Sequence, residues 1–512
     1  MNDPKLTRRD MLKIIGVTPM ILLECSKHNS TALFNPPQKP PNILILVFDS
    51  LSARNVSLYG YPRKTTPNLE RFAQRATVYH RHYASGNFTT PGTASILTGV
   101  YPWTHRALNM RDQTLPQFTD QNIFSLLNHS YHTFAYTHNT FAYIHLQRFR
   151  KSIDNLLKIS DLALYSDSFA EKLANSDYFV TNETELLTLK NESASSSSLV
   201  LSLFDKKQRL NRVDEINRAY HKQFPRGLPN CPTGKDSKQC YTVEDAFEWL
   251  ESQITTQANP FLGYIHINPP HSPYNPHREF IGMFKDSFEP PEKPEHHFSE
   301  NDSQNKLNRL RRQYDEFIAY ADSRFGRLFD FMLASGALNN TILIVTSDHG
   351  EMFERGIQGH VTPTLYEPII HIPLIIFHPK QNARRDIFIP TNNVDLLPTL
   401  AQLSDQDVPD WCEGRVLPGF DEGEISPDRS IFTVEGKQNP KHGPLKEATF
   451  AVIRGNQKLI HYQGYPGFED VNELYDLEND PEEITDIYSN DDPIATKLKI
   501  ELESTLILST KY

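Results

Sequence analysis

The run from Ile43 to Phe48 (ILILVF) is apolar at every position and is followed directly by Asp49 and Ser50. A strand with one exposed face alternates apolar and polar residues, so an unbroken apolar run predicts a central strand buried on both faces. Open α/β sheets bind their ligands at the carboxyl ends of such strands. We therefore predict a functional role for Asp49; the structural alternative is that it caps the following turn.

A second run of this kind extends over residues 340–347 (NTILIVTS) and ends at Asp348 and His349. A third buried strand is predicted over Pro260–Ile267, and it leads into the segment NPPHSPY, which contains His271. Acidic and imidazole side chains thus follow two buried strands, where they are candidates for one shared site. The structural alternative for the Asp-His-Gly segment is a simple turn.

The stretch Asn87–Gly99 (NFTTPGTASILTG) predicts the start of a helix, because Pro91 suits a first helical turn and disfavours helix just before it. A hydroxyl held there, such as that of Thr89, faces unpaired backbone N–H groups and the positive end of the helix dipole. Such a position favours a bound anion. The structural alternative is a plain N-cap.

Asp49, Asp348, His349 and Thr89 together offer two carboxylates, one imidazole and one hydroxyl. These groups form a four-ligand set for a divalent metal ion. The metal would lower the pKa of the Thr89 hydroxyl and make it a nucleophile near neutral pH.

Residues 1–40 are interpreted as a twin-arginine-type leader and a Pro-rich linker, because Arg8 and Arg9 precede an apolar stretch, Ile14–Leu23, that is too short to span a bilayer. This predicts export by the twin-arginine machinery to the periplasm or another extracytoplasmic compartment, with no transmembrane helix in the mature chain. A lipid anchor at Cys25 is the minor alternative, since Glu24 fits a lipoprotein cleavage site poorly.

The rest of the chain divides into a main domain at 41–405, with an insertion at about 150–240, and a C-terminal subdomain at 406–512. The main domain includes a long amphipathic helix predicted at about 305–335. The C-terminal subdomain is predicted as a small antiparallel sheet of short alternating strands followed by a terminal helix.

The four cysteines and the charge add two further expectations. Cys231 and Cys240 bracket the loop CPTGKDSKQC at a hairpin-like spacing, which favours a disulfide over a zinc site because no second Cys or His pair is nearby. Cys412 is then left as a buried thiol. The net charge of -11 argues against a general nucleic-acid partner or an anionic membrane surface.

From about Pro41 to Tyr488 the sequence resembles the sulfatase family of the alkaline phosphatase superfamily. The blocks that match, in the order in which the family has them, are Pro41–Tyr59 with Thr65–Leu69, Thr89–Gly99, Pro270–Tyr274, Thr346–Glu351, Gly359–His360 with Tyr366–Glu367, and Glu473–Glu483. The resemblance implies an α/β fold of the alkaline-phosphatase-like sulfatase type. In that fold a large central, mostly parallel sheet lies between helices, and a small C-terminal antiparallel sheet and helix follow.

The resemblance also implies a role for each matching residue. Asp49, Asp348 and His349 would hold the metal, and Thr89 would attack sulfur or phosphorus while also touching the metal. His271 and His360 would bind the anion or assist the leaving group.

Several positions depart from the family pattern. Sulfatases carry Cys or Ser, oxidised to formylglycine, at the position of Thr89, and Arg at the position of Thr93. Thr cannot give the same aldehyde hydrate because its β-carbon carries a methyl group. The family's active-site lysines are absent, and Ser50 stands where many sulfatases have a second aspartate. Fewer carboxylates and one imidazole favour Zn²⁺ or Mn²⁺, with Ca²⁺ as the alternative.

The sequence therefore predicts an exported metal-dependent hydrolase that cleaves a phosphate or sulfate ester through Thr89, with the phosphoester favoured. The expected substrates are small-molecule, glycan or lipid-headgroup esters. Three alternatives stay open: a sulfatase that works without formylglycine, a phosphoethanolamine-type transferase, and a catalytically degenerate binding protein.

Overall fold

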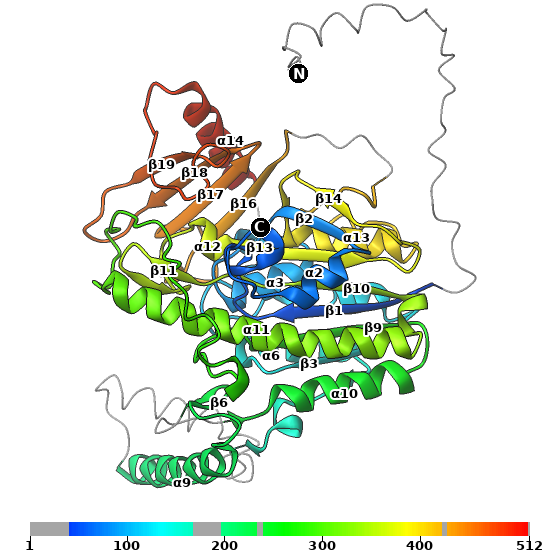
Figure 1. Cartoon of the computed structure of the whole chain (residues 1–512). Helices are drawn as coiled ribbons and strands as arrows, with labels where there is room; N and C mark the ends of the chain where they lie inside the picture. Colours follow the sequence, from blue (N-terminus) through cyan, green and yellow to red (C-terminus); the bar gives the residue numbers. More distant parts are fainter. Residues whose placement is uncertain (1–39, 167–195, 233–238, 422–427, 510–512) are drawn as a thin grey trace, which may run out of the picture. The chain divides into compact units, whose positions relative to one another are not determined.

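Strand β1 (Asn42–Phe48) lies in the centre of a nine-stranded sheet, between the parallel strands β10 (Thr341–Thr346) and β9 (Phe261–Ile267), and all three are buried at every position. The strand order is β14-β2-β13-β10-β1-β9-β3-β4, with β15 paired to β2 (Figure 1). The other strands of this sheet are β2 (Thr77–Tyr83), β3 (His132–Thr137), β4 (Asn155–Leu156), β13 (His371–Phe377), β14 (Arg385–Ile387) and β15 (Thr391–Asn392). The pairings are parallel except those of β13, which runs antiparallel to β10 and β2.

Alternate residues of β1 enter two separate hydrophobic cores, which is why the whole run is apolar. Leu44, Leu46 and Phe48 pack with helices α2 (Pro67–Ala73), α10 (Val243–Thr256) and α11 (Gln304–Ala334). Ile43, Ile45 and Val47 pack on the opposite face of the sheet. The helices there are α3 (Thr89–Thr98), α5 (Ile123–Leu127), α6 (Thr140–Arg148) and α13 (Leu396–Leu403). The predicted sheet between two helical layers is confirmed.

The C-terminal part forms a four-stranded antiparallel sheet in the order β16-β17-β18-β19, beside which helix α14 (Pro493–Ser509) packs. Its strands are β16 (Ser430–Glu435), β17 (Ala448–Arg454), β18 (Gln457–Gln463) and β19 (Val471–Asp476). A bridge between Gly86 and Val434 joins β16 to the segment just before α3, and the Thr433 hydroxyl donates to the carbonyl of Ala84 at 2.6 Å. The predicted small sheet and terminal helix are confirmed.

One long helix, α9 (Ser196–Tyr220), and several short elements complete the fold. The short elements are the α-helices α4 (Pro102–His105) and α12 (Glu367–Ile370), the hairpin of β11 (Met352–Glu354) and β12 (Ile357–Gly359), and the two-residue strands β5 (Tyr165–Ser166), β6 (Gly227–Leu228), β7 (Cys231–Pro232) and β8 (Gln239–Cys240). The 3₁₀ turns are Ala53–Asn55, Ser57–Tyr59, Pro116–Thr119, Arg150–Ser152, Ile159–Leu162, Arg278–Phe280, Ala337–Asn340 and Asn393–Asp395.

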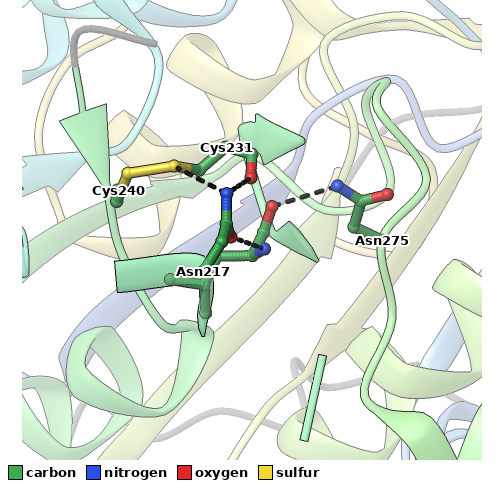
Figure 2. Close-up of a disulfide and its surroundings, with 5 residues drawn as sticks. Asn217, Cys231, Cys240 and Asn275 are labelled. Atoms are coloured by element: carbon green, nitrogen blue, oxygen red, sulfur yellow. Dashed lines mark hydrogen bonds between the residues drawn. A yellow bond between two sulfur atoms is a disulfide. The ribbon is translucent and has the colours of Figure 1, made fainter. Parts of the chain in front are cut away.

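These elements come from a computed structural model that describes residues 40–166, 196–232, 239–421 and 428–509. The predicted leader and Cys25 lie outside the described residues. Within them, no helix is long and apolar enough to cross a membrane. Cys231 and Cys240 form the predicted disulfide (Figure 2), and Cys412 is a partly buried free cysteine.

Candidate active site

The carboxyl ends of β1, β9 and β10 bring two carboxylates and two imidazoles together. Asp49 follows β1, His266 is the last residue but one of β9, and Asp348 and His349 follow β10. All four side chains are fully buried. Nε2 of His266 lies 3.4 Å from an oxygen of Asp49 and 3.6 Å from an oxygen of Asp348. Nε2 of His349 lies 3.6 Å from Asp49 and 3.5 Å from Asp348.

Ser50 orients both carboxylates rather than adding a third one. Its backbone has a φ of 64°, in the left-handed region that a residue with a side chain seldom adopts. In this conformation its N–H donates to Oδ1 of Asp348 at 3.2 Å, and its hydroxyl donates to Oδ1 of Asp49 at 3.0 Å. The backbone N–H of His349 also donates to Oδ1 of Asp348, at 3.0 Å. Oδ2 of Asp348 is therefore left facing the two histidines.

The histidines present Nε2 to the same point. Nδ1 of His349 lies 2.9 Å from the carbonyl of Gly350, so it carries the proton and leaves the lone pair of Nε2 directed into the site. Burial lowers the pKa of His349, which favours the neutral form that a metal requires. Nε2 of His266 and Oδ2 of Asp348 have no hydrogen-bond partner among the residues that the structure describes.

This donor set fits a divalent metal ion. Ligand bonds of about 2.1 Å in a tetrahedron place donor atoms about 3.4 Å apart, close to the separations found here. Burial and the charge of Asp49 raise the pKa of Asp348, so both carboxylates cannot be ionised cheaply unless a cation lies between them. Asp49, His266 and Asp348 meet the spacing of a three-ligand group, and His349 lies beside them.

Thr89 is the first residue of α3 and its hydroxyl reaches this cluster. Oγ1 lies 3.3 Å from Nε2 of His349. Gly92 allows this approach, because a Cβ there would lie 2.3 Å from the carbonyl oxygen of Asp348. The N-cap is Phe88 and no side chain caps the helix, so the plain N-cap interpretation of the Thr pair is wrong.

Asn139 holds the Thr89 hydroxyl from the other side. As N-cap of α6 it accepts the backbone N–H groups of Phe141 and Ala142 through Oδ1, which fixes the orientation of its amide. Nδ2 then donates to Oγ1 of Thr89 at 3.2 Å and to Oδ2 of Asp49.

His271 and His360 lie next to the metal cluster, as the sequence predicted for the anion side of the site. The ring of His360 is 4.2 Å from that of His349, and the ring of His271 is 5.2 Å from that of His360. Oε1 of Glu351 accepts from Nδ1 of His360 at 3.1 Å, and the carbonyl of Ser272 accepts from Nδ1 of His271 at 2.6 Å. Both rings therefore keep Nε2 for a ligand.

The structure brings together all six residues predicted from the sequence, and it adds three that sequence reasoning missed. These are His266, Asn139 and Glu351. A histidine inside an otherwise apolar strand was the one available signal for His266. Thr93 is fully buried one helical turn after Thr89.

Comparison with known proteins identifies the class. The model of the sulfatase family matches residues 41–406, and the model described as N-sulphoglucosamine sulphohydrolase, C-terminal, matches residues 362–509. The chain therefore belongs to the sulfatase family, a family of ester hydrolases.

The individual relatives are distant. The chain is 26% identical to the ulvan-active sulfatase of Formosa agariphila over 424 residues, which are 79% of this chain and 71% of that protein. It is 22% identical to the choline-sulfatase of Rhizobium meliloti over 88% of this chain and 83% of that one.

Solved structures show the same fold. The structure of BT4656 in complex with its substrate, D-glucosamine-2-N,6-O-disulfate, has a TM-score of 0.65 at 17% identity and covers 92% of this chain and 99% of its own. The phosphonate monoester hydrolase SpPMH from Silicibacter pomeroyi has a TM-score of 0.62 at 18% identity, covering 92% and 95%.

Proposed function

We propose that this protein is a metal-dependent ester hydrolase in which Thr89 is the nucleophile, with a phosphate ester favoured over a sulfate ester. The observation that carries the proposal is the position of the Thr89 hydroxyl, 3.3 Å from Nε2 of His349 at the edge of a buried Asp/His cluster. The resemblance to the sulfatase pattern predicts that Thr89 occupies the position of the residue that becomes formylglycine, and its β-methyl group would prevent that modification.

Each side chain then has a defined task. Asp49, Asp348, His266 and His349 would hold a divalent metal, whose positive charge would lower the pKa of the Thr89 hydroxyl and stabilise charge on the substrate's non-bridging oxygens. Asn139 orients Oγ1 of Thr89 for attack on phosphorus.

The Thr89 hydroxyl loses its proton to solvent as the bond from Oγ1 to phosphorus forms and the bond to the leaving oxygen breaks, and that oxygen takes a proton from Nε2 of protonated His360 or His271. Water then attacks phosphorus and gives a proton back to that histidine, the bond from phosphorus to Oγ1 breaks, and Oγ1 of Thr89 is reprotonated. With an unmodified Thr, the second step requires water to attack the central atom of the covalent intermediate, which is phosphorus for a phosphoester and sulfur for a sulfate ester. We expect the attack at phosphorus to be the easier one, so unmodified Thr suits a phosphoester better than a sulfate ester.

His266→Ala should weaken metal binding, because it removes one of the two imidazoles that face the carboxylates. We expect the dissociation constant to rise at least about 10-fold, measured by elemental analysis after dialysis against buffered Zn²⁺ or Mn²⁺. His82→Asn is a matched control, since His82 is equally buried but lies in β2 beside Thr391 at 2.9 Å. If His266→Ala bound the metal with wild-type affinity, His266 would not be a metal ligand.

A panel of nitrophenyl phosphate, bis-nitrophenyl phosphate and nitrophenyl sulfate tests the preferred ester. We expect the phosphate esters to have the higher kcat/KM. Faster turnover of the sulfate ester would instead establish the second candidate function, a sulfatase without formylglycine. That function is favoured by relatives such as the ulvan-active sulfatase and by the disulfated glucosamine bound to BT4656. A glycan ester is the substrate class that these names support.

We also retain two proposals from the sequence, namely export through the leader in residues 1–40 and a division into a catalytic domain at 41–405 and a C-terminal subdomain at 406–512. The Cys231–Cys240 disulfide supports export, because disulfides persist in oxidising compartments.

A further inference from the structure

The surroundings of the Cys231–Cys240 disulfide contact two separate segments that carry active-site residues. On the Cys231 side, Asn217 of α9 acts as the connector (Figure 2). Its Nδ2 donates to the carbonyl of Cys231 at 3.0 Å, and its Oδ1 accepts the N–H of Leu228 at 3.1 Å. The carbonyl of Leu228 then accepts from Nδ2 of Asn275 at 3.1 Å.

Asn275 belongs to the loop that carries His271. The N–H of Asn275 donates to the carbonyl of Pro273, and the N–H of His271 donates to the carbonyl of Asn268. The loop from Asn268 to Asn275 is therefore held by hydrogen bonds within itself. A chain of three side chain–backbone hydrogen bonds therefore connects the disulfide to the His271 loop. Asn217 and Asn275 are buried, so these bonds are shielded from competing water.

On the Cys240 side the connection is shorter. Tyr241 follows Cys240 directly, and its ring stacks on that of His138 with centroids 3.8 Å apart and an angle of 6° between the planes. His138 precedes Asn139, which orients Thr89. The N–H of Asn268 also donates to Nδ1 of His138 at 3.4 Å. Cys231 is thus connected to the His271 loop, and Cys240 is connected to the segment His138–Asn139, whose Asn139 side chain bonds to Thr89.

We propose that the Cys231–Cys240 disulfide is a positioning element of the active site, which fixes the separation between His271 and the Asn139–Thr89 pair. The proposal rests on the function proposed for Thr89 and His271. The structural alternative is a staple that stabilises the insertion without affecting the site. The positioning role predicts that removing the disulfide loosens residues 268–275 and 136–142 at the active site, whereas a simple staple predicts a change in the insertion alone.

The test uses the full-length protein with both cysteines replaced, Cys231→Ala/Cys240→Ala, and Cys412→Ala as the matched control. We expect kcat/KM for a phosphate ester to fall about 10- to 100-fold in the double variant, because a small misplacement of catalytic groups has an effect of this size. The inhibition constant of inorganic phosphate should rise. Metal content should change little, because the N–H and hydroxyl of Ser50 still hold Asp348 and Asp49 in place. Cys412→Ala should match the wild type in all three.

A second variant separates positioning from simple stabilisation. Asn275→Ala keeps the disulfide but removes the link from Leu228 to the His271 loop. If the disulfide acts through this link, combining Asn275→Ala with the cysteine double variant should lower kcat/KM much less than the product of the separate effects. Independent, multiplicative losses would overturn the proposal.

Hydrogen–deuterium exchange gives a measurement that does not depend on turnover. In the cysteine double variant, the backbone amides of residues 268–275 and 136–142 should exchange faster, while those of β17 and β18 should not change. Unchanged exchange in both segments, or unchanged kcat/KM in an active enzyme, would overturn the positioning role. An inactive wild type would instead contradict the proposed function and leave the exchange result to decide this inference.

Discussion

Thr89→Ala is expected to lower kcat/KM for a phosphate ester by at least about 10³-fold, because the variant has no hydroxyl to form the covalent intermediate. The two carboxylates and two imidazoles stay in place, so the variant should still bind metal. Initial rates at several substrate concentrations, with elemental analysis of the same samples, measure both quantities.

Thr90 provides the matched control for this prediction. Its hydroxyl donates to the carbonyl of Met110 at 2.8 Å and does not point into the metal cluster. Thr90→Ala should therefore keep activity within a few-fold of the wild type. Thr89→Ser, which retains a hydroxyl, should recover much of the activity. Wild-type turnover by Thr89→Ala would exclude Thr89 as the nucleophile.

Lys458→Met is expected to have the largest effect on stability. Nζ of Lys458 is fully buried in β18 and lies 3.2 Å from Glu367 and 2.7 Å from Glu483. Without the lysine, two buried carboxyl groups lose their cation, which we expect to lower the free energy of unfolding by roughly 3–5 kcal/mol. The shift of the urea midpoint, multiplied by the wild-type slope, measures this change.

The buried lysine also joins the two sheets, since Glu367 begins α12 beside the central sheet whereas Lys458 belongs to the C-terminal one. Lys446→Met, at an exposed position of the same subdomain, should change the free energy of unfolding by less than about 0.5 kcal/mol. If both variants shifted the midpoint equally, the buried ion pairs would have no special role in joining the sheets.

The central strands were predictable because their environment imposes a simple pattern. β1 and β10 have helices on both faces, and their central runs, residues 43–48 and 342–345, are therefore apolar at every position. β2, with the sequence TVYHRHY, was not predicted from its sequence. Two of its polar residues are only partly buried, whereas His82 is buried and its Nδ1 bonds to Thr391, a partner more than 300 positions away. Such a partner leaves no local pattern.

The same distinction applies to the active site. Residues that directly follow buried strands could be assigned in advance, as Asp49 and Asp348 show. His266 lies within β9, and it joins the site because the register places it opposite Val47 of β1 and Thr137 of β3. Asn139 acts through the direction of its amide group, which is set by the backbone of α6. The register of β9 and the approach of Asn139 to Thr89, 50 positions away, arise only when distant segments pack together.

The most direct test of the central claim is the location of the metal. Crystals of the purified protein, measured at the absorption edge of the metal that elemental analysis identifies, would give an anomalous difference map. We predict one peak bound by Asp49, Asp348, His266 and His349, with Oγ1 of Thr89 within bonding distance. A protein that binds no metal there, or a peak that Thr89 and the two histidines do not contact, would contradict the account.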